Sequence, residues 1–160
     1  MTTSRVPALI DYLVGAFQAA ATLGQATPPV AVYDGPPVTA DPSQLALYVG
    51  VDDTFSDWAA GSATSDQIRT GLAAKRQETV TIHCCAVAWS GVDSIKTVRT
   101  SAFAILAAVE DLVRSNGDNF GGNAAGAVPG VAGITLQQAN VDAATAQVMF
   151  SITFISFIGS

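Results

Sequence analysis

Charged side chains are scarce in this chain of 160 residues. They make up 12% of the sequence, against about 25% in an average soluble domain, and only two lysines and two glutamates occur. The 7 basic and 13 acidic residues give a formal net charge of −6, so no basic patch can neutralise many DNA phosphates. A sequence-specific DNA reader is therefore excluded. The surface is expected to consist of small and uncharged polar residues, part of it covered by other subunits.

Cysteines and long apolar runs are also few. Cys84 and Cys85 are adjacent and cannot join distant segments, which excludes a disulfide-rich secreted scaffold. The longest apolar stretch, 148–158, is interrupted by hydroxyl residues and is shorter than the roughly 20 residues of a membrane span, so no membrane partner is expected. A signal peptide is not expected either, because Asp11 interrupts its apolar core and Pro7 lies where a helix would begin. We expect synthesis in the cytoplasm.

Hydrophobic residues are abundant, at 49% of the chain, and their spacing predicts two helices. The first helix is predicted over 3–23, with Thr3 or Ser4 as its cap and Gly24 as its stop. The second is predicted over 94–115, capped by Asp93 or Ser94. The expected apolar stripes are Val6, Leu9, Ile10, Leu13, Phe17 and Ala20 in the first helix, and Ile95, Val98, Ala102, Ile105, Leu106, Val109, Leu112 and Val113 in the second.

Alternating apolar residues predict the strands. The predicted strands are 30–33, 45–51, 76–90, 131–140 and 144–158, the last two forming an antiparallel hairpin. Residues 52–74 lack periodicity, so we expect a long, partner-contacting loop with a short helical turn near 66–74. The glycine-rich segment 117–130 is expected to be a flexible loop. The prediction is one α+β domain over 1–160, with a mostly antiparallel sheet of about four to five strands, two helices on one face and long loops.

Candidate chemistry is sparse. His83, Cys84 and Cys85 are the only His and Cys residues, whereas a zinc site needs about four ligands, and strand geometry directs Cys84 away from the other two. The acidic residues at 52, 53 and 57 lack the closing carboxylate of a calcium loop. The glycine-rich segment lacks the Lys-Ser/Thr pair of a phosphate-binding loop. We therefore predict no catalytic, cofactor-binding or metal-binding residues, no cofactor, and no enzyme activity.

Three segments carry a resemblance to a known family. They are VAVYDGPPV at 30–38, LALYVGV at 45–51 and KRQETVTIHCCAVAWSG at 75–91, followed by a helix and a terminal β-hairpin. Together they resemble the tail terminator proteins of long-tailed, siphovirus-type bacteriophages, especially those of actinobacteria. The DGPP turn and the Arg-x-Glu start of the central strand, Arg76 and Glu78, are its most specific motifs. The resemblance covers nearly the whole chain in the order of its elements.

The resemblance implies a structural virion protein that forms a homo-oligomeric ring, typically a hexamer, at the neck end of the tail. Such a ring ends polymerisation of the tail tube protein and presents a surface to head-completion or neck proteins. DNA passes through the lumen without specific binding, in keeping with a net negative charge. Local reasoning selects ten candidate assembly-interface residues: Asp34, Gly35, Pro36, Pro37, Asp57, Trp58, Lys96, Arg99, Gly121 and Gly122.

Two alternatives remain open on the sequence. Another neck or tail component, such as a head-closure, connector or tail tube subunit, fits the same composition and element order. An enzyme or small-ligand binder would need a pocket with convergent polar groups, for which the sequence offers His83 and scattered carboxylates.

Overall fold

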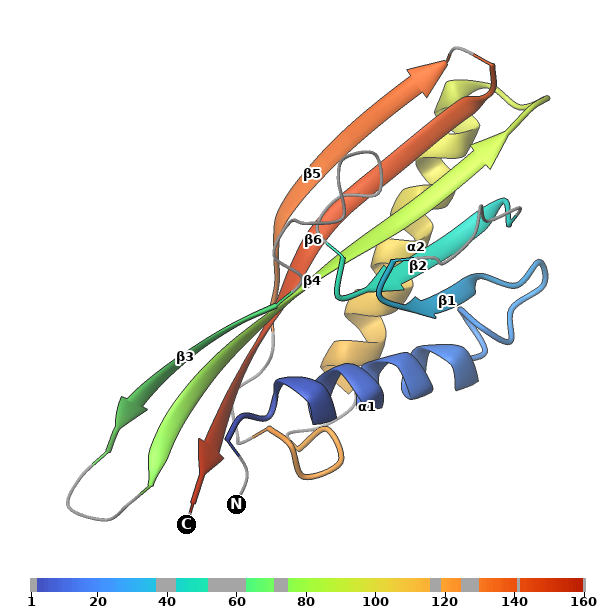
Figure 1. The fold of residues 1–160 in the computed structure, drawn as a ribbon. Coiled ribbons are helices and arrows are strands. Elements are labelled where there is room, and N and C mark those ends of the chain that lie inside the picture. The colour runs from blue at the N-terminus through green and yellow to red at the C-terminus, as the bar shows by residue number, and fades with distance from the viewer. Residues whose placement is uncertain are drawn as a thin grey trace.

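The computed structural model describes residues 3–36, 43–51, 63–70, 75–115, 119–124, 130–140 and 142–159. Two helices and six strands occur in this part of the chain (Figure 1). In chain order they are α1 (Val6–Ala19), β1 (Ala31–Asp34), β2 (Leu45–Val49), β3 (Ala63–Arg69), β4 (Arg76–Ser90), α2 (Ile95–Ser115), β5 (Gly130–Asn140) and β6 (Ala144–Ile158).

The six strands form one open sheet in the order β1-β2-β4-β6-β5, with β3 also paired to β4. β1 and β2 are parallel, and every other pair is antiparallel. β4 and β6 pair along their whole length, from Arg76 opposite Ile158 to Ser90 opposite Ala144. β2 and β3 lie beside different halves of β4, so β3 and the adjoining ends of β4 and β6 extend beyond both helices in Figure 1. We call the half of the sheet that contains β3, residues 63–69, 76–82 and 152–158, the arm. Its tip lies beyond the helices, whereas Val80, Ile82 and Phe154 are buried in the core beneath them.

Both helices cover the same face of the sheet, as predicted. Leu9, Leu13 and Phe17 of α1 are buried in one cluster with α2 and the inward-facing residues of the strands. The buried stripe of α2 is the predicted one, apart from Ile95 and Leu112, which are partly buried against the same cluster. On β4, the predicted face of Val80, Ile82, Cys84, Ala86 and Ala88 points into this core. The α+β class is therefore confirmed.

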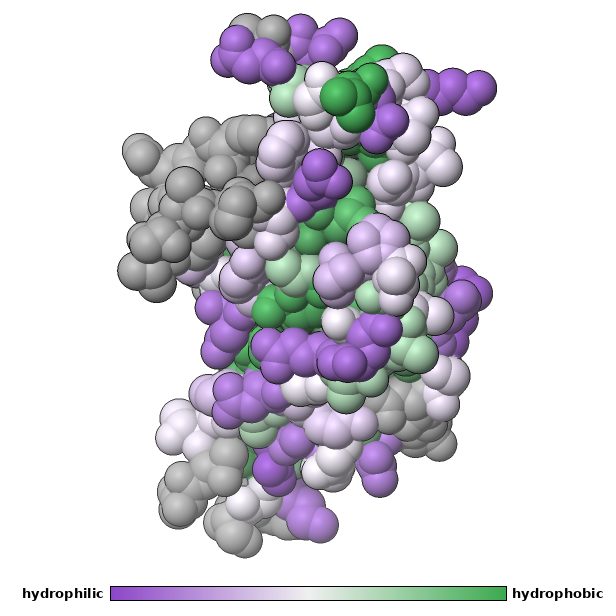
Figure 2. Space-filling view, turned by 90° about the vertical axis from the view of Figure 1, so that its right-hand side faces the viewer, coloured by the Kyte–Doolittle hydropathy of each residue, from purple (hydrophilic) through white to green (hydrophobic). Residues whose placement is uncertain are grey.

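The surface reflects the low charge of the sequence. Figure 2 shows strongly hydrophilic residues scattered over one side of the molecule, with hydrophobic atoms reaching the surface between them. Five large hydrophobic residues are exposed in the described part of the chain: Ile68, Val92, Phe103, Ile134 and Phe157. No helix in the described ranges is long and apolar enough to cross a bilayer.

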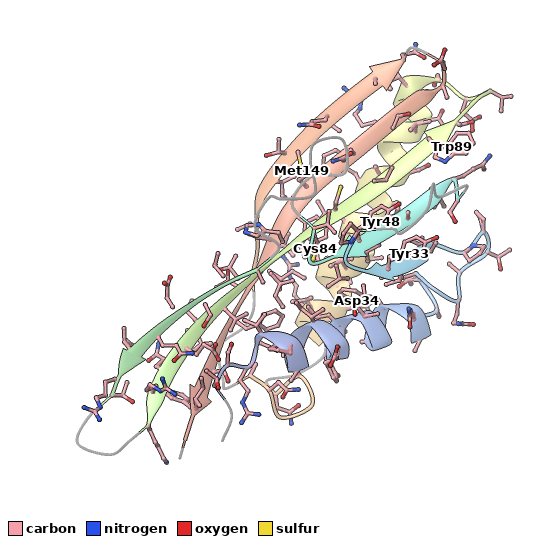
Figure 3. The ribbon with its side chains drawn as sticks, in the orientation of Figure 1. Tyr33, Asp34, Tyr48, Cys84, Trp89 and Met149 are labelled. Atoms are coloured by element: carbon pink, nitrogen blue, oxygen red, sulfur yellow. The ribbon has the colours of Figure 1, made fainter. Side chains whose placement is uncertain are left out.

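The opposite face of the sheet carries a second, smaller hydrophobic cluster. Ala46, Tyr48, Val51 and Cys85 are buried in it, with Tyr33, Val87 and Met149 packed alongside. Tyr33 and Tyr48 stack from adjacent strands with ring centroids 5.3 Å apart and an interplanar angle of 18° (Figure 3). The mixed character predicted for this face of β4 is confirmed, since Cys85 is fully buried while His83 and Val87 are partly exposed.

The element predictions were wrong at three points. Residues 63–69 form β3, not a loop leading into a helical turn, which raises the strand count to six. α1 ends at Ala19, and its N-cap position is Arg5, one residue after the predicted Ser4, whose hydroxyl nevertheless accepts the Val6 N–H at 3.1 Å. Gly24, the predicted stop, therefore lies beyond the end of the helix. Its N–H donates to the Phe17 carbonyl at 3.0 Å and closes the turn that follows α1. β2 ends at Val49 because Gly50, with φ +81°, turns the chain.

Candidate functional site

A fully buried carboxylate joins the arm to the start of α1. Glu78 lies on the helix-covered face of β4, opposite Gln67 of β3 and Ser156 of β6, and is 0% exposed. Its Oε1 accepts hydrogen bonds from the Ser4 hydroxyl, from the Ser65 hydroxyl at 2.5 Å and from Gln67 Nε2 at 3.4 Å. Its Oε2 accepts the backbone N–H of Arg5 at 2.8 Å. We call Glu78 and these four donors the Glu78 cluster.

The Glu78 cluster also caps α1. The first backbone N–H groups of a helix lack partners within the helix, and a nearby anion stabilises the helix dipole. Glu78 accepts one such group from Arg5, and the Ser4 hydroxyl accepts the N–H of Val6 at 3.1 Å. Burial alone raises the pKa of Glu78, but the hydrogen bonds from Ser4, Ser65, Arg5 and Gln67 together outweigh it, so the pKa lies below its ordinary value of 4.5. The carboxylate is ionised at neutral pH.

The outer edges of β5 and β3 are the second feature that can act on a partner. Among the described strands, none pairs with the outer edge of β5 or of β3. β5 is 11 residues long, and all of it except Val131 and Leu136 is exposed. β3 is exposed at five of its seven positions, all except Ala63 and Gln67. Unpaired N–H and C=O groups along such edges are templates for pairing with another chain.

The edge at β1 is different, because α1 protects it. β1 has four residues, and Gln18 Nε2 of α1 donates to the Val32 carbonyl at 3.2 Å. The predicted interface residues Asp34, Gly35 and Pro36 lie just where this strand ends. Asp34 and Pro36 are exposed, while Gly35 has φ +74° and donates its N–H to the Val49 carbonyl at 2.8 Å. They form a fixed turn at the surface. Pro37 lies outside the described residues.

Gly121 and Gly122 lie in a loop, as predicted, and residues 119–124 of this loop form turns that pack on the core. Phe120 is fully buried and packs edge-on against Tyr12 of α1 and Phe154 of β6, with centroid distances of 6.0 and 5.1 Å. Phe120, Gly121 and Gly122 all have positive φ, and a Cβ added at Gly121 would lie 2.9 Å from the Tyr12 ring. Both glycines are exposed on their outer side.

Lys96 and Arg99 share one side of α2, as their spacing predicts. Lys96 is exposed, whereas Arg99 is partly buried and its Nη1 donates to Gln138 Oε1 of β5 at 3.1 Å. Arg99 therefore contacts the edge strand β5. Among the described residues, neither Lys96 nor Arg99 forms a hydrogen bond or ion pair with the other predicted interface residues, Asp34 and Gly121. Asp57 and Trp58 lie outside the described residues.

The His83-Cys84-Cys85 segment packs as a strand. Cys84 points into the main core and Cys85 into the smaller cluster, and both are 0% exposed. Burial raises the pKa of the Cys84 thiol to about 12, so it carries almost no nucleophilic thiolate at neutral pH. The His83 carbonyl accepts the N–H groups of Gly50 and Val51 at 2.7 and 3.0 Å. In the described ranges no three His, Cys, Asp or Glu side chains are grouped to hold a metal ion. The acidic residues at 52 and 53 lie outside these ranges.

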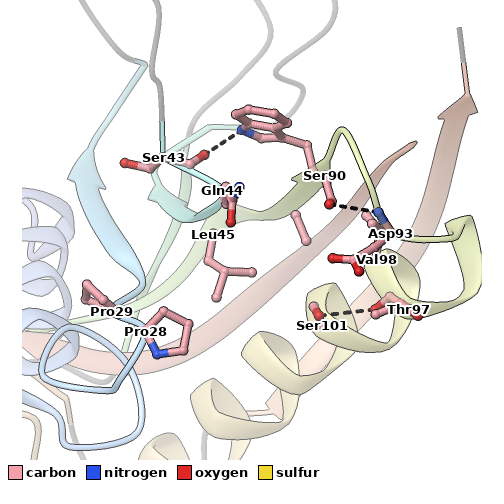
Figure 4. A pocket seen from close by; sticks show the side chains of 12 residues that line it. Pro28, Pro29, Ser43, Gln44, Leu45, Ser90, Asp93, Thr97, Val98 and Ser101 are labelled. Atoms are coloured by element: carbon pink, nitrogen blue, oxygen red, sulfur yellow. Dashed lines mark hydrogen bonds between the residues drawn. The ribbon is translucent and has the colours of Figure 1, made fainter. Parts of the chain in front are cut away.

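A pocket of about 420 Å³ opens between the start of β2, the end of β4 and the first turns of α2 (Figure 4). Several of its polar groups are occupied by local structure. The Ser90 hydroxyl accepts the N–H groups of Val92 and Asp93, Ser101 donates to the Thr97 carbonyl, and Trp89 Nε1 donates to the Ser43 carbonyl. Beside the pocket, the Ser94 hydroxyl caps α2 by accepting the Thr97 N–H at 3.3 Å. Ser94 is one of the two caps predicted for this helix. The Ser90 and Ser101 hydroxyls of the pocket are thus engaged in a turn and in the first turns of α2.

No model of a known protein family matches this chain, and no curated protein sequence is significantly similar to it.

Sequence reasoning missed the Glu78 cluster and the β3 edge. In the sequence, Glu78 stands out only as part of an Arg-x-Glu motif. The available signal was its place in the alternation of β4. Glu78 lies on the same side of the strand as Val80 and Ile82, so this charged residue must face the core and needs hydrogen-bond donors there. Its donors come from positions 11 to 74 residues away, which local patterns do not show.

Proposed function

We propose that this chain is a structural subunit of a long bacteriophage tail, a tail terminator that forms a closed ring at the head-proximal end of the tail tube. The ring, taken as a hexamer, stops addition of tube protein and provides the joining surface for a head-completion protein. DNA passes through its lumen without specific binding, since the net charge of −6 disfavours contacts with phosphate. The protein is not an enzyme and resides in the neck of the virion.

One observation carries this proposal: the sheet is open and offers an exposed strand at each side. β5 bounds one side and β3 the other side of β4. Because the two strands are different surfaces of the same chain, contact between them in neighbouring copies is head-to-tail, and head-to-tail contacts close into rings when the rotation allows. The low surface charge supports the same reading, since surfaces that meet other subunits contain fewer Lys and Glu side chains.

The test is the oligomeric state of the purified chain with and without its tail tube protein, measured by native mass spectrometry and negative-stain imaging. We expect a single closed ring that binds one end of a tube and halts its growth. A chain that stays monomeric and never associates with tubes would refute the proposal.

The same images separate the terminator from its structural alternatives. A tail tube subunit would form long helical polymers, whereas a terminator stops at one closed ring. A ring that binds only head-completion proteins and never a tube end would identify a head-closure or connector subunit instead.

A further inference from the structure

We propose that the exposed edge of β5 pairs with the edge of β3 in a neighbouring copy, so that the sheet continues from one subunit to the next. This inference rests on the proposed ring function, because it names the contact between its subunits. The partner is a second copy of this chain, and the surfaces are Thr135–Asn140 on β5 and Ala63–Arg69 on β3.

β5 lacks the usual protection of a sheet edge. Natural edge strands carry charged residues or proline, or are short or bulged, which prevents unwanted pairing. No charged residue occurs in the sequence between Asp118 and Asp142, and β5 contains no proline. A bulge does interrupt the register between Ala132 and Thr135, where Gly133 has φ +63°. Beyond it, Thr135–Asn140 is regular, exposed at all positions except Leu136, and uncharged, so this half has none of these devices.

The exposed hydrophobic residues favour the same two strands. Ile134, in the bulge of β5 next to Thr135, is 53% exposed, and Ile68 of β3 is 61% exposed. These are two of the five large hydrophobic residues exposed in the described ranges. Phe157 of β6, at 47% exposure, lies two strands from Ile68 in the same row of the arm, with Gln77 between them. An apolar surface that reaches the edge of the arm is better explained by contact with another chain than by contact with water.

Strand direction allows the pairing. Within one copy, β3 is antiparallel to β4, β4 to β6 and β6 to β5, so β3 and β5 run in opposite directions. A rotation about an axis close to the strand direction keeps those directions, and β3 then meets the neighbouring β5 as an antiparallel pair. Within one copy, β3 lies at the end of the sheet formed by residues 152–158 of β6, whereas Thr135–Asn140 pairs with residues 144–149 at the other end. The contact therefore needs neighbouring copies to be shifted along the strand direction. Strand tilt in closed sheets supplies such an offset.

The edge at β1 is the weaker alternative partner for β5. It has four residues, and Gln18 already donates to the Val32 carbonyl. β3 is longer, and its Ser65 and Gln67 are hydrogen bonded to buried Glu78 on the side of β4. The strand is therefore held in place while its outer edge stays available, which reduces the entropy lost on association.

Cysteine cross-linking tests the pairing directly. Both native cysteines are fully buried, so introduced cysteines supply the accessible thiols. In one preparation Gln137 of β5, on the face of the sheet that points away from the helices, is changed to cysteine. In the other preparations Thr64, Asp66 or Ile68 of β3, which lie on the same face of the sheet, is changed to cysteine. Mild oxidation of mixed preparations is expected to give a disulfide-linked dimer with at least one β3 position. Neither preparation alone should cross-link, because the contact joins two different surfaces.

A control shares the strand but not the face. Gln138→Cys points to the helix side of the sheet, where Arg99 contacts the native side chain, and should not cross-link with the β3 positions. Cross-linking of the Gln137→Cys preparation by itself would overturn the proposal in favour of a symmetric β5–β5 contact. A ring that forms normally but cross-links at none of the three β3 positions would refute the pairing and leave the ring function standing. A chain that never assembles would refute both.

Charge placed on the edge gives an independent test. The double variant Thr135→Lys, Gln137→Lys should raise the chain concentration needed for assembly by about tenfold or more, as seen by native mass spectrometry. The control Thr22→Lys, Val92→Lys adds the same charge at exposed positions outside β3 and β5 and should assemble like the parent chain. Equal assembly of the edge variant and the control would overturn the assignment of β5.

Discussion

Replacing Glu78 by glutamine tests the attachment of the arm with the least change in shape. The side chain keeps its size, but it loses its charge, and one of its two acceptor oxygens becomes an amide NH₂. At present Oε1 accepts from Ser4, Ser65 and Gln67, and Oε2 accepts the Arg5 N–H at 2.8 Å. Since Glu78 is 0% exposed, water cannot easily replace a partner that is lost.

The expected cost follows from these contacts. A hydrogen bond to a charged group contributes about 1.5–3 kcal/mol, and neutral bonds are roughly half as strong. In the glutamine variant one acceptor position is lost and the remaining bonds become neutral, while the release of a buried charge offsets part of this loss. We expect the free energy of unfolding to fall by about 2–4 kcal/mol at pH 7.

Urea unfolding at pH 7, followed by tryptophan fluorescence, measures this difference. The matched control is Asp66→Asn, the same chemical change on the neighbouring strand at an exposed side chain. We expect the control to keep the parental midpoint. If Glu78→Gln unfolds at the parental midpoint, or if both variants lose the same stability, the carboxylate is not what holds the arm to α1.

The pH dependence gives the sign of the effect. The folded pKa of Glu78 lies below its ordinary value of 4.5, so the unfolded chain takes up the proton first as the pH falls. The stabilisation is therefore complete above about pH 4.5 and is lost as the pH falls from there through the lowered folded pKa. The parent chain should lose more stability than Glu78→Gln across this range. Parallel curves for the two proteins would contradict this assignment of the proton.

Three further outcomes are expected. Gly15→Ala should raise Tm by about 2–4 °C in a thermal melt, because Gly15 lies inside α1 and a Cβ there meets no atom within 4 Å; a lower Tm would contradict this. Phe120→Ala should lower the free energy of unfolding by about 3–5 kcal/mol in urea, since its ring is fully buried between Tyr12 and Phe154, and a loss below about 1 kcal/mol would show that the turn does not anchor there. Cys84 and Cys85 should not react with a thiol reagent at pH 8 until urea unfolds the chain, and rapid native reaction would contradict their burial.

The long periodic elements could be predicted from sequence because their apolar patterns extend over many residues. β4 and β6 begin and end at the predicted positions, and α2 within one residue. Fifteen alternating residues specify one register, since a slip by one would expose the whole core face. The face on which each strand is buried, and the placement of both helices on that face, follow from the same pattern.

β3 could not be predicted because nothing in its own sequence requires a strand. Its residues ATSDQIR are exposed on both faces at most positions, so no apolar alternation marks them. The strand exists because β4 extends beyond β2 and offers an unpaired edge to the segment that precedes β4 in the chain. That edge is a property of the assembled sheet. The fixed turn at Phe120 escaped prediction for a similar reason, since a single aromatic residue among glycines has no periodicity.

Glu78 and the proposed subunit contact meet at β3, and this allows one variant to separate two roles. Ser65 and Gln67 are bound to the carboxylate, so Glu78→Gln loosens the strand whose outer edge is proposed to bind β5 of the next copy. If the carboxylate orders that edge, assembly should weaken in Glu78→Gln at urea concentrations where the subunit is still folded, although β5 is unchanged. If the variant unfolds more easily but assembles like the parent chain, the backbone pairing with β4 is sufficient to order β3. Glu78 then stabilises only the start of α1. Native mass spectrometry beside the unfolding curve distinguishes the two, because binding favours the chain whose edge is already ordered.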